Sequence, residues 1–410
     1  MITGPLAWAA DSVARWGFMK AVRRLRAGSL VIETPDGRTE EVHGPRPGPE
    51  AVLRVNHPSF YRRFLLHGEI GFGEAYQHGL CDSPDLVALL RLALVNRQAI
   101  DFNRGPLRLL SRLKDRKLHE SHGNTAERSR DNIHAHYDLG NAFFSLFLDE
   151  TMTYSCAVFE EPDQPLPDAQ RNKYRRICEA AKLTADDHVL EIGTGWGGFA
   201  IHAAGTYGCK VTSITISTEQ HDLARRRVAE AGLAELIDVR VTDYRDAGGV
   251  YDKIVSIEMF EAVGAEYFET FFSKCAALLE PGGSLTMQVI TVPDATYEAQ
   301  QTGVNWIQKY VFPGGVLPSL EQMERSSAPT GLKISAVHDI GPDYAPTLRQ
   351  WRRTFWDRID DVRAQGYDEW FIRTWDYYLA ASEAGFLTRT FSDVQVVFDK
   401  AGSVPPGART

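Results

Sequence analysis

The sequence predicts an α/β fold in which a doubly wound, mostly parallel sheet is joined to a smaller N-terminal α+β domain. A chain of 410 residues is too long for one ordinary core. From about residue 170 onward, patterns typical of strands and helices alternate, which favours parallel strands joined by right-handed crossovers. The apolar run 189–192 ends in a turn with three glycines, and a helical pattern follows. We expect the N-terminal domain in residues 1–120 and the larger domain in residues 121–410.

The alternating elements of the larger domain can be placed in order. Strands are expected at 188–193, 209–216, 236–241, 251–257 and 284–290. Helices are expected at 197–207, 218–231 and 264–279. The segment 291–330 does not fit the alternation and is interpreted as a helical insertion over the carboxyl edge of the sheet. Beyond it we expect a strand at 332–340, helices at 345–364 and 367–384, and a strand at 389–398.

The N-terminal domain shows strand patterns before helical ones. Residues 29–33 and 39–43 alternate in hydropathy around Pro35-Asp36-Gly37, which predicts a β-hairpin. The other elements expected in this domain are a strand at 51–55 and helices at 61–66 and 85–95.

Charge is distributed unevenly along the chain. The net charge of −9 argues against general nucleic-acid binding. Residues 1–130 carry 20 Lys and Arg against 14 Asp and Glu, whereas the remaining residues carry 25 against 40. A basic N-terminal part indicates an anionic partner such as a phospholipid membrane, or ordinary solvated charge. A helix over 105–117, apolar on one face with basic flanks, would lie on a bilayer or pack as a linker on the protein itself. The polar segment 121–129 is expected to form a loop.

Cysteine usage and hydropathy indicate a reducing compartment and no membrane span. The five cysteines are scattered and form no C-x-x-C pair, which fits reduced cytosolic thiols and offers no zinc site. The histidines show no metal-ligand spacing, so no catalytic metal is expected. Residues 1–16 lack the apolar run of a signal peptide. The longest apolar run, 86–95, is interrupted by Arg91 and has about half the length of a membrane span.

The glycine turn has the pattern of a cofactor site. The spacing Glu191-x-Gly193-x-Gly195-x-Gly197 is that of the S-adenosylmethionine (SAM) loop of Rossmann-like methyltransferases. The third glycine comes one residue earlier than in the G-x-G-x-x-G dinucleotide fingerprint, and a dinucleotide site is the alternative. The cofactor residues expected at this turn are Glu191, Gly193, Thr194, Gly195 and Gly197.

The next two strand ends supply further cofactor candidates. The second strand ends at Thr215, and Gln220 in the following helix can offer an amide to the ligand. Glu219 is better explained as compensation of charge at a helix N-terminus. The third strand ends in Asp243 and Tyr244, which suit an adenine amino group and the face of the base. The same two residues could instead cap and pack the turn.

Two carboxylates, Glu258 and Glu261, follow the fourth strand among apolar neighbours. Burial raises the pKa of a carboxyl group, which makes it a potential base or a ligand anchor.

Eight short sequence motifs follow one another along the chain, at 136–141, 152–156, 190–198, 214–220, 243–246, 259–264, 306–319 and 343–344. In this order the chain resembles the cyclopropane-fatty-acid synthases over roughly residues 65–398, and the block 309–315 is especially diagnostic. The resemblance implies a SAM-dependent enzyme that modifies a carbon–carbon double bond in a phospholipid acyl chain. It also adds Tyr154 and Ser155 to the cofactor site.

The resemblance further implies a catalytic site. Family members hold a bicarbonate ion as the base, and the matching positions are Cys156, Glu261, the backbone of Ile290, and Tyr344. Gln288 replaces the histidine of the family's His-Thr-Ile motif. A glutamine can hydrogen-bond an anion but cannot carry the positive charge of histidine, which disfavours bicarbonate.

These departures, with Ala262 in place of another family histidine, make the chain similar to a subgroup that converts oleoyl chains to 10-methylene chains, the precursors of 10-methyl branched fatty acids. We therefore expect methyl transfer from SAM to an oleoyl-type phospholipid chain, with Glu261 as base directly or through a water. The alternatives are cyclopropane formation, methylation of a soluble small molecule, and lipid binding without catalysis.

Partners and location follow from this expectation. We expect a phospholipid membrane surface and unsaturated acyl chains as partners, no nucleic acid, and a homo-oligomer. A separate reductase would complete a saturated methyl branch. The protein is expected in the cytoplasm, peripherally on the inner membrane face, with the first domain and the 291–330 insertion shaping the lipid entrance.

Overall fold

The computed structural model describes residues 5–100, 139–301 and 304–402, and these fall into two compact units. Unit 1 comprises residues 5–100, 304–313 and 359–390. Unit 2 comprises residues 139–301, 314–358 and 391–402. Two segments from the last third of the chain are thus grouped with its N-terminal part. The segments 105–117 and 121–129 lie outside the described residues.

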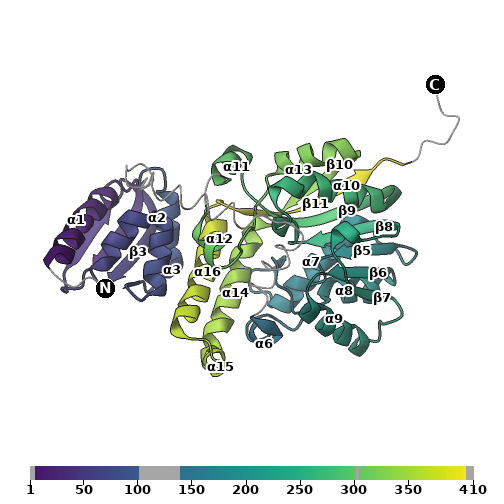
Figure 1. The fold of residues 1–410 in the computed structure, drawn as a ribbon, viewed down its shortest axis with the longest axis horizontal. Helices are drawn as coiled ribbons and strands as arrows, with labels where there is room; N and C mark the ends of the chain where they lie inside the picture. Colours follow the sequence, from purple (N-terminus) through teal and green to yellow (C-terminus); the bar gives the residue numbers. More distant parts are fainter. Residues whose placement is uncertain (1–4, 101–138, 302–303, 403–410) are drawn as a thin grey trace. The chain divides into compact units, whose positions relative to one another are not determined.

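Unit 2 is built on a seven-stranded sheet (Figure 1) with the strand order β10-β11-β9-β8-β5-β6-β7. Its strands are β5 (His188–Ile192), β6 (Lys210–Thr215), β7 (Ile237–Val241), β8 (Tyr251–Ile257), β9 (Leu279–Thr291), β10 (Leu332–Asp339) and β11 (Ser392–Lys400). The five neighbouring strands β7, β6, β5, β8 and β9 run parallel to one another. Strand β11 runs antiparallel to its two neighbours, β9 and β10. The doubly wound, mostly parallel sheet expected from the sequence is confirmed.

Helices cover both faces of this sheet (Figure 1). The α-helices of unit 2 are α6 (Gly140–Phe144), α7 (Leu166–Ala181), α8 (Gly198–Tyr207), α9 (Thr218–Glu230), α10 (Phe268–Leu278), α11 (Asp294–Gln300), α13 (Leu320–Ser327) and α14 (Gly341–Asp357). Successive residues of β5 point to opposite faces. Val189 packs with α7, α8 and α9, whereas Leu190 packs with α10 and α13. Burial on both faces explains why β5 has no polar alternation in the sequence.

Several expected elements differ in extent, and the strand expected at 51–55 begins earlier, at Arg46. The helix expected at 345–364 is two helices, α14 and α15 (Ile359–Ala364), because Arg358 between them leaves helical geometry with φ −110° and ψ 23°. The helix expected at 61–66 continues as α2 (Ser59–Gln77). Gly68, with φ 56°, interrupts α2 as a kink, and the sequence pattern stops before it. The strand expected at 284–290 begins earlier, at Leu279.

Unit 1 contains a four-stranded sheet of order β2-β1-β3-β4. Its strands are β1 (Ala27–Glu33), β2 (Thr39–His43), β3 (Arg46–Val55) and β4 (Cys81–Asp82). Its helices are α1 (Pro5–Val22), α2, α3 (Leu86–Val95), α12 (Trp306–Tyr310), α15 and α16 (Glu369–Leu387). The expected hairpin is confirmed, since β1 and β2 pair antiparallel. Phe18 of α1 packs against Phe60 and Tyr61 of α2, with ring centroids 5.6 and 5.4 Å apart.

Buried hydrogen bonds join α2 to α16 within unit 1. The Tyr76 hydroxyl donates to the carboxylate of Asp376 at 2.6 Å, across 300 positions of sequence. The Gln77 amide donates to the Thr374 hydroxyl at 2.8 Å. Polar groups buried in this way are stabilising only when both partners are present, so α2 and α16 depend on each other.

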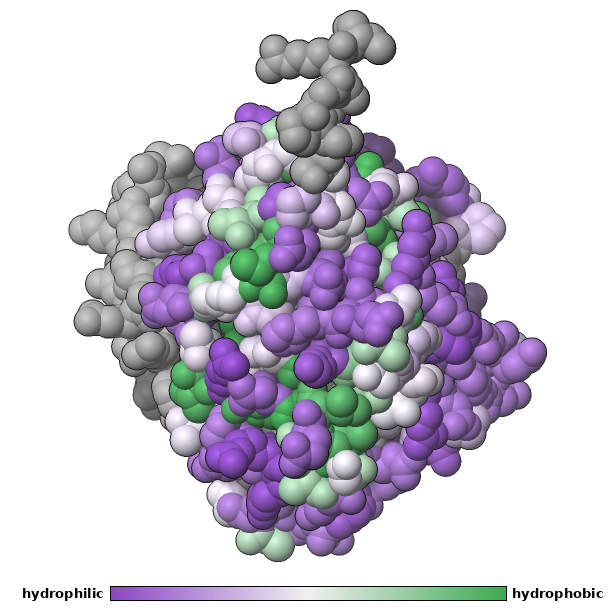
Figure 2. All heavy atoms as spheres, turned by 90° about the vertical axis from the view of Figure 1, so that its right-hand side faces the viewer, coloured by the Kyte–Doolittle hydropathy of each residue, from purple (hydrophilic) through white to green (hydrophobic). Residues whose placement is uncertain are grey.

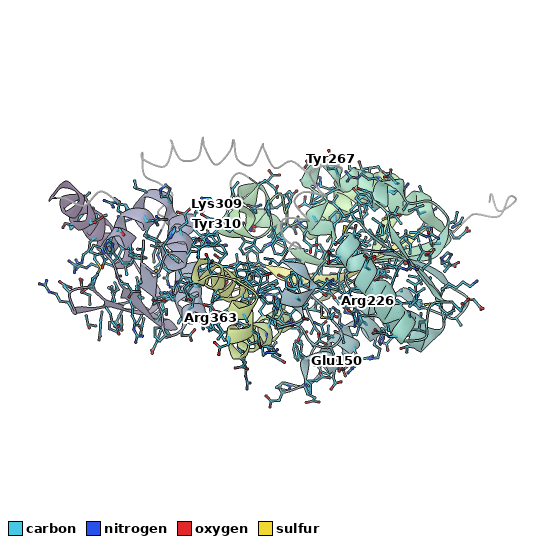
Figure 3. All side chains as sticks on the ribbon, turned by 60° about the horizontal axis from the view of Figure 1, so that its bottom comes forward. Glu150, Arg226, Tyr267, Lys309, Tyr310 and Arg363 are labelled. Carbon is cyan, nitrogen blue, oxygen red and sulfur yellow. The ribbon has the colours of Figure 1, made fainter. Side chains whose placement is uncertain are left out.

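Helix α12 is held against α2 in the same unit. Lys309 and Tyr310, labelled in Figure 3, both bond one carboxylate oxygen of Glu74, at 2.7 and 2.8 Å. A Cβ at Gly73 would lie 2.4 Å from the indole of Trp306, so only glycine permits this approach. The block 309–315 singled out in the sequence thus begins at an ion pair of unit 1.

None of the described helices is long and apolar enough to cross a membrane. Figure 2 shows the side that lies to the right in Figure 1, which belongs to unit 2, as mostly hydrophilic with small hydrophobic groups between the polar residues.

Candidate active site

The turn between β5 and α8 has backbone angles that glycine adopts readily. Gly193, Gly195 and Gly197 have φ of 101°, 51° and 84°. A Cβ at Gly193 would lie 3.1 Å from Cβ of Met259, and one at Gly197 would lie 3.3 Å from Cβ of Ala224. A Cβ at Gly195 would meet no described atom within 4 Å. Gly195 therefore marks the open side of the turn, where a ligand can approach the backbone beside the N-terminus of α8.

Glu191 lies in β5 directly before this turn. Its side chain is buried, and burial raises its pKa to about 8, against the opposing effect of a hydrogen bond from the Ser213 hydroxyl. The Ser213 hydroxyl also lies 2.7 Å from that of Thr194. The Ser213 hydroxyl thus links the Glu191 carboxyl to Thr194 in the glycine turn. The hydrogen-bond partner of Glu191 is therefore a protein group and not a ligand.

The ends of β6 and β7 carry the other sequence-predicted cofactor residues. The Thr215 hydroxyl donates to the amide oxygen of Gln220 at 3.0 Å, which fixes the orientation of that amide. Asp243 is buried and accepts two bonds from the guanidinium of Arg245, at 2.9 and 2.7 Å. The guanidinium also lies 5.5 Å from the ring centroid of Tyr244. Asp243 and Tyr244 are therefore engaged with Arg245 in the turn that they form.

Tyr154 belongs to an aromatic cluster. Its ring centroid is 5.2 Å from those of Phe144 and Trp351. Trp196, inside the glycine turn, lies 5.1 Å from Phe144 and donates to the side-chain oxygen of Asn141 at 2.6 Å. The glycine spacing singled out neither Trp196 nor Asn141, and both are held here beside the turn.

Glu258 is the residue around which the catalytic candidates gather. It follows β8 with φ 46°, an uncommon value for a residue other than glycine. Its Oε1 accepts from the backbone N–H of Cys156 and from the Gln288 amide, both at 2.8 Å. Its Oε2 accepts from the Tyr344 hydroxyl at 2.7 Å. Three donors suit an ionised carboxylate, which can only accept. The structure brings Cys156, Gln288 and Tyr344 together, and it adds Glu258, which was absent from the expected catalytic set.

A second buried acid lies behind Gln288. The Gln288 amide nitrogen has two hydrogens but faces three oxygens, at Glu258 (2.8 Å), Asp393 (3.1 Å) and the carbonyl of Cys156 (3.2 Å). Asp393 is fully buried, and burial together with the charge of Glu258 raises its pKa well above the usual range. The surroundings of Asp393 therefore favour its protonated form.

A buried cation balances this acidic cluster. The ammonium of Lys173, 0% exposed, donates to the Ser155 hydroxyl at 2.6 Å. Burial lowers its pKa to about 8, and the charge of Glu258 opposes that shift. Ser155, expected from the resemblance to lie at the cofactor, is thus also tied to the polar groups around Glu258.

Glu261 has a different environment. Its Oε1 accepts from the backbone N–H of Ile290 at 2.6 Å, and its Oε2 has no hydrogen-bond partner among the described residues. Burial, and next the charge of Glu258, raise its pKa to about 8. The two carboxyls therefore differ in environment: Glu258 accepts from three donors, whereas Glu261 accepts from one backbone N–H and is mostly protonated at neutral pH.

The profile described as mycolic acid cyclopropane synthetase matches residues 124–396. The chain belongs to this family. The tuberculostearic acid methyltransferase UfaA1 of Mycobacterium tuberculosis is 39% identical over 403 residues, or 93% of this chain and 90% of that protein. The cyclopropane-fatty-acyl-phospholipid synthase of Escherichia coli is 36% identical over 366 residues, or 85% and 88%. The solved structure of mycolic acid cyclopropane synthase CmaA1 complexed with SAH and CTAB covers 66% of this chain and 98% of its own, with 29% identity and a TM-score of 0.62.

As a member of the mycolic acid cyclopropane synthetase family, the protein is a SAM-dependent methyltransferase of unsaturated lipid acyl chains, which such enzymes methylate or cyclopropanate. The residues present fit the cofactor. Gly195 leaves the backbone of the turn open, and the oriented amide of Gln220 and the aromatic cluster of Tyr154 belong to the same unit.

Cys156 contributes its backbone and not its thiol to the site of this methyltransferase. The thiol is fully buried and points to the carbonyl oxygens of Ala157 (3.2 Å) and Ile340 (3.7 Å). Burial raises its pKa well above the ordinary value, so it stays protonated and is a poor nucleophile.

The raised pKa of Glu261 predicts a pH-dependent stability difference. An unfolded glutamate titrates near ~4.3, whereas Glu261 in the folded protein has a pKa of about 8. The folded state binds more protons between these values, so this group lowers the free energy of unfolding as pH rises through that window. Glu261→Gln removes the effect. Denaturant unfolding at several pH values should show the variant gaining on the wild type by a few kcal/mol from about pH 5 to pH 8. Parallel pH profiles would contradict the prediction.

Proposed function

We propose that this methyltransferase transfers the methyl group of SAM to the double bond of an oleoyl-type phospholipid chain and forms a 10-methylene chain, with Glu258 as the base. The bonding of Glu258 is the observation that supports the proposal most directly. Its carboxylate takes up donors from Cys156, Gln288 and Tyr344. These are three of the positions that family members, by resemblance, use for bicarbonate. An enzyme with its own carboxylate in this place does not need a free anion as base.

The chemistry requires one methyl transfer and one proton removal. SAM, when bound, supplies an electrophilic methyl group to the alkene, which is a weak nucleophile and must be held in line. Methyl addition to one alkene carbon leaves a positive charge on the other. A hydride shift moves the charge to the methyl-bearing carbon, and loss of a methyl proton to the Glu258 carboxylate gives the methylene group. Loss of that proton before the shift closes a cyclopropane ring instead.

Aromatic and polar neighbours support these steps. The rings of Tyr154 and Trp351, 5.2 Å apart, and that of Tyr344, 6.3 Å from Trp351, are suited to stabilising a positive charge. Gln288 orients the Glu258 carboxylate, and the protonated Asp393 behind it avoids a second buried negative charge. Gln288 and Asp393 thus act as positioning residues. Glu261, the base expected from the sequence, is the alternative base.

The proposed product is tested by expression in a host rich in oleoyl lipids, with mass spectrometry of the fatty-acid esters after derivatisation of double bonds. A methylene chain and a cyclopropane chain have the same mass, but only the methylene chain retains a double bond for derivatisation. We expect an exocyclic methylene chain. A product that resists derivatisation is the ring and would reject the proposal.

Cyclopropane formation is the second candidate function. The 36% identical relative named cyclopropane-fatty-acyl-phospholipid synthase favours it, and the 39% identical relative named tuberculostearic acid methyltransferase favours methyl branching. Gln288, in place of the family's histidine, is the local feature that supports branching over ring closure.

The location and partners belong to the same proposal. The enzyme works peripherally on the cytoplasmic membrane face as a homo-oligomer, and a separate reductase saturates its methylene product. The phospholipid substrate supports the membrane location.

A further inference from the structure

Helix α1 presents a second apolar face after its first one is packed. Ala14 and Phe18 are buried in unit 1. On the other side of the helix, Val13 and Trp16 are 67% and 66% exposed, more than any other large hydrophobic side chain among the described residues. Their spacing of three positions places them on one helix face. Two neighbouring apolar side chains this exposed on one helix face form a candidate interaction surface, and the charges around them indicate its partner.

Basic side chains extend this face toward the end of the helix. Lys20, four positions after Trp16, is exposed, and its ammonium lies 5.0 Å from the centroid of the Trp16 ring. Arg23 and Arg24 follow and are also exposed. In the part of the chain that the structure describes, no carboxylate pairs with Lys20, Arg23 or Arg24, so their charges are available to a partner.

The nearby acidic groups are already neutralised by other cations. Asp11 pairs with Arg62 at 3.4 Å, and Glu40 pairs with Arg15. The face therefore combines an indole, a valine and three positive charges that have no carboxylate partner among the described residues. We define Val13, Trp16, Lys20, Arg23 and Arg24 as the α1 face.

We propose that the α1 face docks the enzyme on an anionic phospholipid bilayer. An indole fits the boundary between headgroups and acyl chains, and adjacent Lys and Arg reach anionic headgroups on flexible stems. A second copy of the chain is a poorer occupant, because a symmetric contact would bring two sets of the same three positive charges together. The inference rests on the proposed function, since the acyl chains to be modified belong to membrane phospholipids.

The test is co-sedimentation of the full chain with vesicles of phosphatidylglycerol and phosphatidylcholine, compared with vesicles of phosphatidylcholine alone. Val13→Ser/Trp16→Ala is expected to weaken binding to the anionic vesicles about tenfold. Lys20→Glu/Arg24→Glu should weaken it by a similar factor, and added salt should weaken wild-type binding. The control Val250→Ser/Trp356→Ala removes a valine and a tryptophan that are 54% and 39% exposed elsewhere, and should bind as the wild type does.

Activity on lipid dispersed in detergent separates this inference from the proposed function. The α1-face variants should keep wild-type activity there, because the detergent delivers the acyl chain without docking. Unchanged vesicle binding by both variants would overturn the inference. A wild-type dimer that becomes monomeric on Val13→Ser/Trp16→Ala would also overturn it and assign the face to a second copy. Vesicle binding by a wild type that methylates no lipid would leave the inference standing and reject the proposed function.

Discussion

Glu258→Gln is expected to lower the turnover of acyl chains about 10³-fold while SAM binds nearly as before. Glutamine has the shape of glutamate and can still accept from Cys156 and Tyr344, but it cannot take a proton from the methylated chain. The measurements are the rate of product formation from detergent-dispersed lipid and calorimetric titration with SAM. Glu261→Gln is the matched control, because it neutralises the neighbouring carboxyl that is already mostly protonated at neutral pH. Full activity of Glu258→Gln with loss of activity in Glu261→Gln would make Glu261 the base.

Chemical rescue sharpens this prediction. Glu258→Ala leaves the Cys156 N–H, the Gln288 amide and the Tyr344 hydroxyl around a space that a small carboxylate can enter. Added formate should restore part of the turnover in a saturable way, because it replaces the missing acceptor and base. Formamide, which is similar in size but neutral, should not. Equal effects of formate and formamide would show that the space needs filling but not a base.

Gly195→Ala is expected to weaken SAM binding at least about 30-fold, more than the loss of fold stability explains. The added methyl group points into the open side of the turn, where no described atom lies within 4 Å. The positive φ of 51° adds a cost of about 1 kcal/mol to folding. Isothermal titration with SAM and thermal unfolding of the same preparation measure the two effects separately.

Gly232→Ala is the matched control for Gly195→Ala. Gly232 also has a positive φ, 69°, and open space around an added Cβ, but it follows α9, away from the glycine turn. It should lose similar stability and bind SAM like the wild type. If both variants bind SAM equally well, the open side of the turn at Gly195 is not where the cofactor lies.

The fold of unit 2 could be predicted from the sequence because its signals are local. Strand β5 is mostly apolar, with Glu191 as its one acid, and the three glycines that follow it specify a turn that other residues would strain. Both the strand pattern and the glycine spacing can be read from neighbouring positions in the sequence. The handedness of parallel crossovers limits the possible arrangements, but the position of β11 between β9 and β10 depends on long-range pairing that no local pattern shows.

The meeting of Glu258 with its donors could not be predicted in this way. Cys156 precedes Glu258 by 102 positions, and Tyr344 follows it by 86. The sequence showed two carboxylates after β8, but nothing local indicates which of them turns toward Gln288. The backbone decides it, since the positive φ at Glu258 redirects its side chain. A positive φ at a residue other than glycine cannot be read from the sequence and is seen only in the structure.

The hydrogen bond between Tyr76 and Asp376 has a consequence for folding during synthesis on the ribosome. Residues 5–100 leave the ribosome well before α16, and translation at ~5–20 residues per second separates them by many seconds. Until then the side of α2 that packs against α16 is exposed to chaperones and proteases. A fragment ending near residue 120 would remain in that unfinished state, so expressing the first 120 residues alone should yield aggregated or degraded polypeptide.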